Sequence, residues 1–239
     1  MNTIKVDSKQ CKMIAHRGVS GLEKENTLAA FIAAGNRSHY GVETDVHKTG
    51  DGKFVVIHDA ETGRVAGDNI NVETTSFEYI RKLTLKDIDG TKGRADLRIP
   101  TLAEYIRTCK KYEKYCVLEF KSQYHYEDIC EMVEIIEKEG WLDHMIFISF
   151  SFDNLVLLRK RCPKAPAQFL TGSYSEEMVQ MINAANIDLD IYFSALTEEN
   201  IKYLHSLGII VNAWTVDDAA VAEKLISWGI DYITSNILE

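Results

Sequence analysis

The chain reads CVLEF at 116–120 and MIFISF at 145–150, two short apolar runs that predict buried strands. Each run is followed by a segment of amphipathic spacing, over 126–139 and 153–161, that predicts a helix. The alternation continues with expected strands at 168–170, 189–193, 209–214 and 232–234, and with expected helices at 175–184, 197–207 and 217–228. Strands that alternate with helices are typical of a parallel α/β fold.

The N-terminal part of the chain adds two strands to this series. One is the run at 13–15, followed by an alanine-rich helix over 28–34, and the other covers 41–47. Thr49-Gly50-Asp51-Gly52 predicts a tight turn, after which 54–58 returns beside the second strand. Eight strands with intervening helices predict an α/β fold of the (β/α)8 TIM barrel type.

Residues 60–99 interrupt this alternation. They are rich in glycine and small polar residues and contain one short helical pattern, at 77–83. We interpret them as a small insertion after the second strand, because they have too few large apolar residues for a core of their own. The next helix is expected to begin after Thr101 as its N-cap. We expect one domain over 1–239, with the final helix of the barrel short or missing.

Composition excludes several classes of protein. The 239 residues are 46% hydrophobic, which supports a sizeable core and argues against disorder. With 36 acidic and 27 basic residues the net charge is −9, and no basic stripe is present, so we expect no nucleic-acid partner. No apolar stretch is long enough to span a bilayer, so we expect no stable membrane insertion.

The cysteines favour a reducing environment. Cys11, Cys109, Cys116, Cys130 and Cys162 are odd in number and form no C-x-x-C pair, which is typical of free thiols that pack as small hydrophobic side chains. The N-terminus is polar and lacks the apolar segment of a secretory signal. We therefore expect a cytoplasmic location, although a secreted protein trimmed of its signal would look the same.

Three carboxylates are expected to converge at the C-terminal mouth of the barrel, where active sites of this fold lie. Glu43 and Asp45 are two residues apart on a strand and face the same way, and Glu119 ends the third strand. At ~4 Å each pair would repel by about 4 kcal/mol at an effective dielectric of ~20. A bound divalent cation would offset this repulsion, and an all-oxygen ligand set favours Mg²⁺ or Ca²⁺. Alternatively, the first two acids are on the surface and Glu119 only pairs with Lys121.

Two histidines follow strands and precede charged residues: His16 stands before Arg17, and His58 before Asp59. Two imidazoles beside an acid cluster suit general acid–base catalysis, one as base and one as acid, in an order that the sequence leaves open. A structural hydrogen-bonding role for each histidine is the alternative. Arg17 suits a bidentate contact with phosphate oxygens, or else pairs with a glutamate at 23 or 25.

The remaining candidates are weaker. Trp214 is expected either to cover a ligand at the mouth or to fill the barrel. His47 is expected to lie past the inward end of its strand and is not assigned as a ligand. Four further histidines are expected in helices or loops without an acidic partner: His39, His125, His144 and His205.

In these residues the chain resembles the glycerophosphodiester phosphodiesterase family. The matching motifs are His16-Arg17-Gly18, Glu25-Asn26-Thr27, Glu43-x-Asp45-Val46, Thr49-x-Asp51-Gly52, His58-Asp59, Pro100-Thr101-Leu102, Glu119-x-Lys121, Trp214-Thr215-Val216 and Asp231-x-Ile233-Thr234. They occur in family order over nearly the whole chain. Two departures concern the far side of the mouth: the chain stops soon after the last strand, and that strand ends in Thr234-Ser235-Asn236, where many relatives carry an aspartate.

The resemblance implies a barrel with a small insertion after the second strand. It also implies one divalent cation, Mg²⁺ or Ca²⁺, held by Glu43, Asp45 and Glu119. The implied reaction is hydrolysis of a small-molecule glycerophosphodiester to sn-glycerol 3-phosphate and an alcohol. In it a glycerol hydroxyl attacks phosphorus, and the cyclic phosphate that forms is then hydrolysed. A place in lipid and glycerol metabolism follows from these products.

The resemblance also implies roles for the remaining site residues. His16 and His58 would form the acid–base pair. Arg17 and Lys121 would contact the phosphate or the metal ligands, and Trp214 would contact the substrate.

Three other functions stay open at this point. The first is a phospholipase D-like hydrolase of lysophospholipids. The second is a lyase that uses Lys121 as a Schiff-base nucleophile, although Glu119 two residues away favours the charged amine. The third is a non-catalytic barrel that binds phosphodiesters. The leaving alcohol, the native metal and the oligomeric state are not determined by the sequence.

Overall fold

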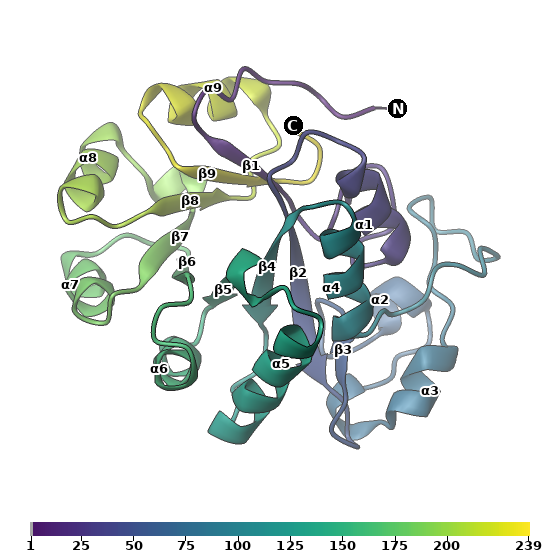
Figure 1. The fold of residues 1–239 in the computed structure, drawn as a ribbon. Helices are drawn as coiled ribbons and strands as arrows, with labels where there is room; N and C mark the ends of the chain where they lie inside the picture. Colours follow the sequence, from purple (N-terminus) through teal and green to yellow (C-terminus); the bar gives the residue numbers. More distant parts are fainter. Residues whose placement is uncertain (1) are drawn as a thin grey trace.

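The computed structural model describes residues 2–239, which form a ring of strands surrounded by helices (Figure 1). The strands of this part of the chain are β1 (Lys12–Ala15), β2 (Gly41–Lys48), β3 (Phe54–Val56), β4 (Tyr115–Phe120), β5 (Met145–Ser149), β6 (Ala167–Thr171), β7 (Asp188–Tyr192), β8 (Val211–Trp214) and β9 (Tyr232–Ser235). All of them lie within two residues of the expected strands.

Eight of these strands form a closed parallel barrel. Their order is β1-β9-β8-β7-β6-β5-β4-β2, and the pairing of β1 with β2 closes the ring. β3 pairs antiparallel with β2 after the predicted turn and lies outside the ring. The predicted (β/α)8 barrel is therefore confirmed, and its C-terminal strand ends meet at one mouth.

The helices are α1 (Leu28–Gly35), α2 (Gly63–Ala66), α3 (Phe77–Lys82), α4 (Leu102–Lys111), α5 (Tyr126–Lys138), α6 (Phe152–Arg161), α7 (Glu176–Ala184), α8 (Glu198–Ser206) and α9 (Ala219–Ser227). Short 3₁₀ turns are η1 (Val72–Thr74), η2 (Leu142–His144) and η3 (Phe193–Ala195). Several helices begin a residue or two later than expected because a polar side chain caps them. Thr197 and Asp218, for example, accept hydrogen bonds from first-turn backbone N–H groups. Within the described residues no helix follows β9, as expected.

Alternation along the strands divides the core into two layers. In β4, Cys116, Leu118 and Phe120 belong to the large apolar layer between the barrel and the helices. Val117 points the other way, into the interior of the barrel. The interior cluster comprises Ile14, Val117, Ile146, Ile148, Leu170 and Tyr232.

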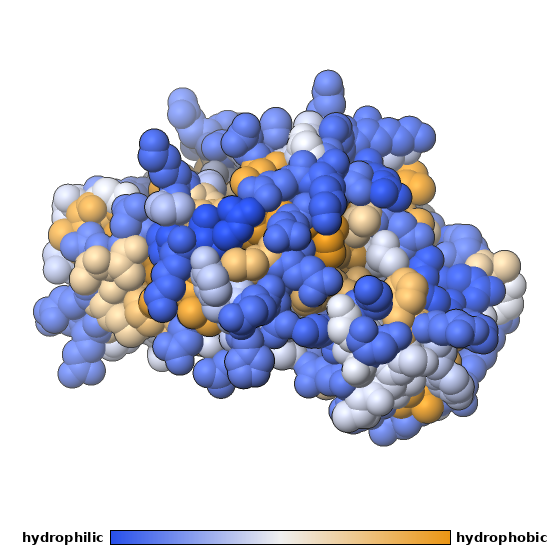
Figure 2. Space-filling model, turned by 60° about the horizontal axis from the view of Figure 1, so that its bottom comes forward, coloured by the Kyte–Doolittle hydropathy of each residue, from blue (hydrophilic) through white to orange (hydrophobic). Residues whose placement is uncertain are grey.

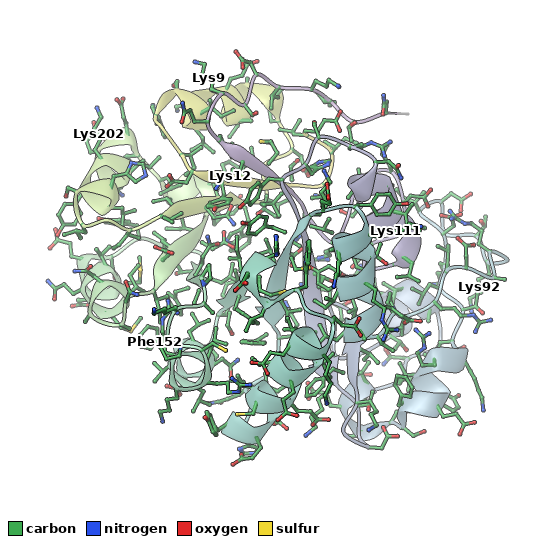
Figure 3. The ribbon with its side chains drawn as sticks, in the orientation of Figure 1. Lys9, Lys12, Lys92, Lys111, Phe152 and Lys202 are labelled. Atoms are coloured by element: carbon green, nitrogen blue, oxygen red, sulfur yellow. The ribbon has the colours of Figure 1, made fainter. Side chains whose placement is uncertain are left out.

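Aromatic rings and a lysine fill the N-terminal end of the barrel. Lys12, at the start of β1, places its ammonium group 4.5 Å from the centroid of the Tyr40 ring and 5.2 Å from that of Tyr232 (Figure 3). Tyr40 in turn stacks on Tyr115, with ring centroids 4.4 Å apart. Since this end is filled, a ligand has access to the interior from the C-terminal mouth.

Residues 60–99 contain α2, η1 and α3 and lie beside β3 (Figure 1). They contribute to a second cluster of buried apolar side chains, made up of Val55, Ile57, Val65, Ala66, Val72, Ile80, Leu83, Leu85, Leu97 and Ile99. This cluster was not anticipated, because its members are spread singly among polar residues in the sequence. The assignment of 1–239 to one domain stays a prediction.

The surface is mainly hydrophilic on the face that Figure 2 shows, and its hydrophobic residues are divided among small patches. Among residues 2–239, no helix combines the length and the apolar character that a membrane crossing requires.

Candidate active site

The C-terminal strand ends surround a cavity of about 170 Å³. It is lined by all the predicted site residues except Asp45, namely His16, Arg17, Glu43, His58, Glu119, Lys121 and Trp214. Asp45 lies directly behind them, 3.4 Å from Arg17 and 3.5 Å from Lys121. The structure thus brings together residues from β1, β2, β3, β4 and β8.

Three buried carboxylates form the centre of this site. Glu43, Asp45 and Glu119 are 2%, 1% and 7% exposed, and one oxygen of each lies within 4.8 Å of the others. Glu43 and Asp45 share a face of β2, and the parallel register pairs Asp45 with Glu119 of β4. The expectation that the first two acids face the barrel, and not the surface, is confirmed.

Cationic and amide groups surround the carboxylates. Lys121 Nζ lies 2.8 Å from Glu119 and 3.5 Å from Asp45, so the predicted pairing of Lys121 with Glu119 exists inside the cluster. Arg17 donates its backbone N–H to Glu43 at 2.8 Å and its Nη1 to Glu25 at 3.0 Å. Asn26 Nδ2 donates to Asp45 at 2.7 Å. The opposite oxygen of Asp45, Oδ1, is buried and accepts no hydrogen bond from residues 2–239.

The three acids titrate differently because their neighbours differ. Burial, and next the charge of Asp45, raise the pKa of Glu43 well above its ordinary value. The same two causes raise the pKa of Glu119 to about 8. Burial also acts to raise the pKa of Asp45, but Arg17 and Lys121 outweigh it and hold that pKa at about 2.

This arrangement fits a divalent cation. The cluster offers only oxygen atoms, which hard cations such as Mg²⁺ and Ca²⁺ prefer. Oδ1 of Asp45 accepts no hydrogen bond, and the pKa of Glu43 and of Glu119 is raised, so the described protein groups alone do not neutralise three carboxylates. Glu43, Asp45 and Glu119 are therefore the residues that could hold the ion.

His16 follows β1 and is oriented by the loop after β9. Its Nδ1 lies 2.7 Å from Asn236 Oδ1, so Nδ1–H is the donor and Nε2, 3.9 Å from Glu43, carries the free lone pair. Asn236 is itself held by Asp217, which accepts from its Nδ2 at 2.6 Å. Burial, and next Arg17, lower the pKa of His16 to about 4. His16 is therefore neutral around pH 7.

His58 follows β3 and is oriented by a chain of ion pairs. Asp59 accepts from its Nδ1 at 2.6 Å, which leaves Nε2 for the cavity. Arg64 of α2 donates to Asp59 at 2.6 Å and to both oxygens of Glu25 at 2.6 and 2.9 Å. Because Glu25 also holds Arg17, one arginine of residues 60–99 connects the loops that carry Arg17 and His58.

His47 lies within β2, whose predicted range 41–47 includes it, and it does not line the cavity. It is 4% exposed, and its Nδ1 lies 2.9 Å from Glu73. Its Nε2 lies 3.1 Å from the backbone oxygen of His58, which places it behind that residue. The expectation that His205 has no acidic partner was wrong, since its Nε2 lies 2.9 Å from Asp231.

The sequence model of the Glycerophosphoryl diester phosphodiesterase family matches residues 16–238, which include every residue of this site. The chain belongs to this family. Its predicted resemblance is therefore confirmed.

Several relatives match over nearly their whole length. A glycerophosphodiester phosphodiesterase of Caldanaerobacter subterraneus subsp. tengcongensis is 30% identical over 94% of this chain and 93% of that protein. One of Bacillus subtilis is 26% identical over 93% of this chain and 82% of that protein. A phosphodiesterase of Oleispira antarctica, solved in complex with the product sn-glycerol-3-phosphate, matches with a TM-score of 0.87 at 26% identity, over 98% of this chain and 96% of that chain.

In this chain Trp214 lies at the mouth of the barrel, where it lines the cavity. Its ring contacts those of Phe150 and Tyr192, at centroid distances of 5.6 and 5.7 Å. Its Nε1 donates to the backbone oxygen of Asp190 at 3.3 Å. Of the two expectations for Trp214, a position beside a ligand at the mouth fits better than one inside the barrel.

Four residues of the site were not given a role from the sequence. Asn26 and Asn236 hold Asp45 and His16, Arg64 connects two loops, and Asp190 lines the cavity from β7. Burial, and next Glu119, raise the pKa of Asp190 well above its ordinary value. An acid inside the otherwise apolar run 189–193 was a signal that pointed to Asp190, whereas the partners of Arg64 are visible only in the fold.

The raised pKa of Glu119 predicts a pH-dependent stability in the absence of a divalent cation. A group that binds its proton more tightly when folded lowers the free energy of unfolding as the pH rises from 4.5 to about 8. A tenfold difference in proton affinity between the folded and the unfolded chain corresponds to about 1.4 kcal/mol. The lowered pKa of Asp45 acts in another window, since its stabilisation is lost only as the pH falls from 3.8 to about 2.

Urea unfolding with chelator, at steps from pH 6.5 to 8, measures this effect, because below pH 6.5 the lowered pKa of His16 makes stability rise with pH. We expect stability to fall over this range and Glu119→Gln to reduce the fall, to which Glu43 also contributes. Added Mg²⁺ or Ca²⁺ should restore stability at pH 8, because these ions bind the ionised carboxylates. A wild-type profile without slope would contradict the assignment of Glu119 as a protonated acid.

Proposed function

We propose that the protein hydrolyses glycerophosphodiesters to sn-glycerol 3-phosphate and an alcohol, with one divalent cation. The proposal is carried by one observation: a cluster of three buried carboxylates, two of which line the cavity, lies beside two histidines whose Nδ1 atoms are engaged and whose Nε2 atoms remain available. The Oleispira relative, solved with sn-glycerol-3-phosphate as its product, supports the choice of substrate.

We assign the base to His16 and the acid to His58. His16 pairs with the neutral amide of Asn236 and lies beside Arg17, and both features favour the neutral imidazole that accepts a proton. Burial lowers the pKa of His58 as well, but the charge of Asp45 and the hydrogen bond to Asp59 oppose this shift, so of the two histidines His58 is better placed to carry the proton. His16 would take the proton of the attacking glycerol hydroxyl, and His58 would donate one to the departing alcohol oxygen. In the second half-reaction His58 would accept a proton from water, and His16 would return its proton to the glycerol oxygen.

Arg17 and Lys121 would hold the phosphate. When bound by Glu43, Asp45 and Glu119, the cation would neutralise these acids and polarise the phosphate. The N–H groups of Arg17 and Lys121, which face the same acids, would then be available to phosphate oxygens. The oxygen ligand set supports Mg²⁺ or Ca²⁺ as the ion.

The rival lyase is disfavoured by the surroundings of Lys121. Burial acts to lower the pKa of this amine, but Asp45 and Glu119 outweigh it and raise the pKa above its ordinary value. A Schiff-base nucleophile must be a free amine, so this lysine suits electrostatic binding. A phospholipase D-like activity on lysophospholipids and a non-catalytic barrel remain alternatives that the assay below distinguishes.

We further propose that residues 1–239 act as a single catalytic domain, in which 60–99 support His58 through Arg64. A cytoplasmic location and a place in lipid and glycerol metabolism are also proposed. The location is supported by the thiols of Cys11, Cys109, Cys116, Cys130 and Cys162, which are all free.

The first prediction concerns the reaction and its cation. Purified protein is expected to release sn-glycerol 3-phosphate from glycerophosphocholine or glycerophosphoethanolamine, and EDTA is expected to abolish release because the acids lose their ion. Added Mg²⁺ or Ca²⁺ should restore it. Turnover that is unchanged by the chelator would show that the reaction does not need the metal. Hydrolysis of lysophosphatidylcholine alone would favour the phospholipase D-like alternative. Tight binding of glycerophosphodiesters without turnover would favour the non-catalytic barrel.

The second prediction separates the two histidines. His58→Ala is expected to lower kcat by at least about 10²-fold on glycerophosphocholine but much less on the p-nitrophenyl ester of glycerol 3-phosphate, whose leaving phenolate needs little protonation. His16→Ala should lower kcat on both esters, since both reactions need the base. Stopped assays with circular dichroism as a folding control measure this, and the opposite pattern would exchange the roles.

The third prediction concerns Arg64. Arg64→Ala is expected to lower kcat about tenfold with little change in KM, because Asp59 and Glu25 lose the group that fixes them. The basic limb of the pH profile should move to lower pH, because His58 must be protonated to act as the acid and loses a well-placed carboxylate. Arg94→Ala is the matched control, since Arg94 pairs with Glu23, Asp87 and Asp96, and none of these lines the cavity. Equal effects of the two variants would assign Arg64 a general structural role.

A further inference from the structure

Three strands of the barrel have a regular composition at the mouth. Each carries an inward-facing residue followed, two positions later, by an aromatic residue. The pairs are Ile148 and Phe150 after β5, Asp190 and Tyr192 in β7, and Asn212 and Trp214 in β8. We call Phe150, Tyr192 and Trp214 the aromatic wall.

The rings of the aromatic wall are available to a ligand. The rings of Phe150 and Tyr192 each lie against the ring of Trp214, at interplanar angles of 85° and 54°. Phe150 is 51% exposed and Tyr192 39% exposed. Large aromatic side chains with this exposure at the mouth of a cavity indicate a binding surface, because packing alone would bury them.

Asp190 places a buried carboxyl group on this side of the cavity. It is 2% exposed, lines the cavity, and its Oδ1 has no hydrogen-bond partner within residues 2–239. A buried carboxyl group without a partner is unfavourable, and an apolar ligand beside it would leave it so. A cation beside it would supply an opposite charge.

Across the cavity, Arg17 and Lys121 offer positive charge for a phosphate. A substrate that carries a phosphate and a cation would therefore meet a complementary group on each wall. Aromatic faces attract cations, and most strongly those that are weakly hydrated, such as quaternary ammonium groups.

We propose that the aromatic wall and Asp190 bind a positively charged alcohol, so that the enzyme prefers glycerophosphodiesters whose leaving alcohol carries a quaternary ammonium group. This inference rests on the proposed function and names the substrate class of the same site. Phe150, Tyr192, Trp214 and Asp190 are its specificity-determining residues.

Two esters with leaving alcohols of similar shape but different charge separate the effect of the charge from that of the shape. The choline ester of glycerol 3-phosphate and its 3,3-dimethylbutyl ester differ by the replacement of a positive nitrogen with a neutral carbon. We expect wild-type kcat/KM to be at least about tenfold higher for the choline ester, which corresponds to about 1.4 kcal/mol. Hydrolysis of both esters at equal kcat/KM would overturn the inference and leave the proposed function standing. Hydrolysis of neither would overturn both.

Variants then locate the effect. Tyr192→Leu and Phe150→Leu keep an apolar side chain without a ring, and Asp190→Asn removes the charge. Each is expected to lower the ratio of the two kcat/KM values at least about threefold. Tyr203→Leu, at a residue 48% exposed on α8, is the matched control and should keep the wild-type ratio. If Asp190→Asn does not fold, Tyr192→Leu and Phe150→Leu still test the inference, and an unchanged ratio in both of them would overturn it.

Discussion

The mutual repulsion of Glu43, Asp45 and Glu119 is the constraint on which the rest of the site depends. Two adjacent parallel strands fix these carboxylates in place, so they cannot move apart. Arg17 and Lys121 stabilise Asp45 as an anion, but the pKa of Glu43 and of Glu119 stays raised. In a purely structural ion-pair network, positive and negative groups would be expected in equal number. The excess of acid over base at a cavity is what distinguishes a cation site from such a network.

The barrel explains how distant parts of the chain supply this site. Parallel strands end at one mouth, so a residue at the end of any strand is automatically near the others. The loops after β1 and β3 contribute the histidines, and each imidazole is oriented through Nδ1 by a residue outside its own strand. Residues 60–99 add a second level of support, because Arg64 fixes the acids that hold Arg17 and His58.

Strand positions and the inward direction of Glu43, Asp45 and Glu119 were predictable, because alternation and the length of apolar runs are local properties. The metal-site acids and histidines also had local motifs. The partners that orient these side chains had no such local motif. His16 and Asn236 are 220 residues apart, and Arg64 and Glu25 are 39 apart, so only the folded chain pairs them. The contact of His205 with Asp231 and the apolar cluster of 60–99 were missed for the same reason.

Two groups of strands contribute different kinds of side chain to the site. β1, β2 and β4, with the loop after β3, carry the acids, the histidines, Arg17 and Lys121, and these are connected by hydrogen bonds and ion pairs. β5, β7 and β8 carry Phe150, Tyr192 and Trp214, whose side chains contact one another mainly through their rings. The hydrogen bonds and ion pairs that hold the acids and the histidines do not involve these rings. Under the proposed function, recognition of the alcohol can therefore change at one group of strand ends while the contacts of the acids and histidines stay the same.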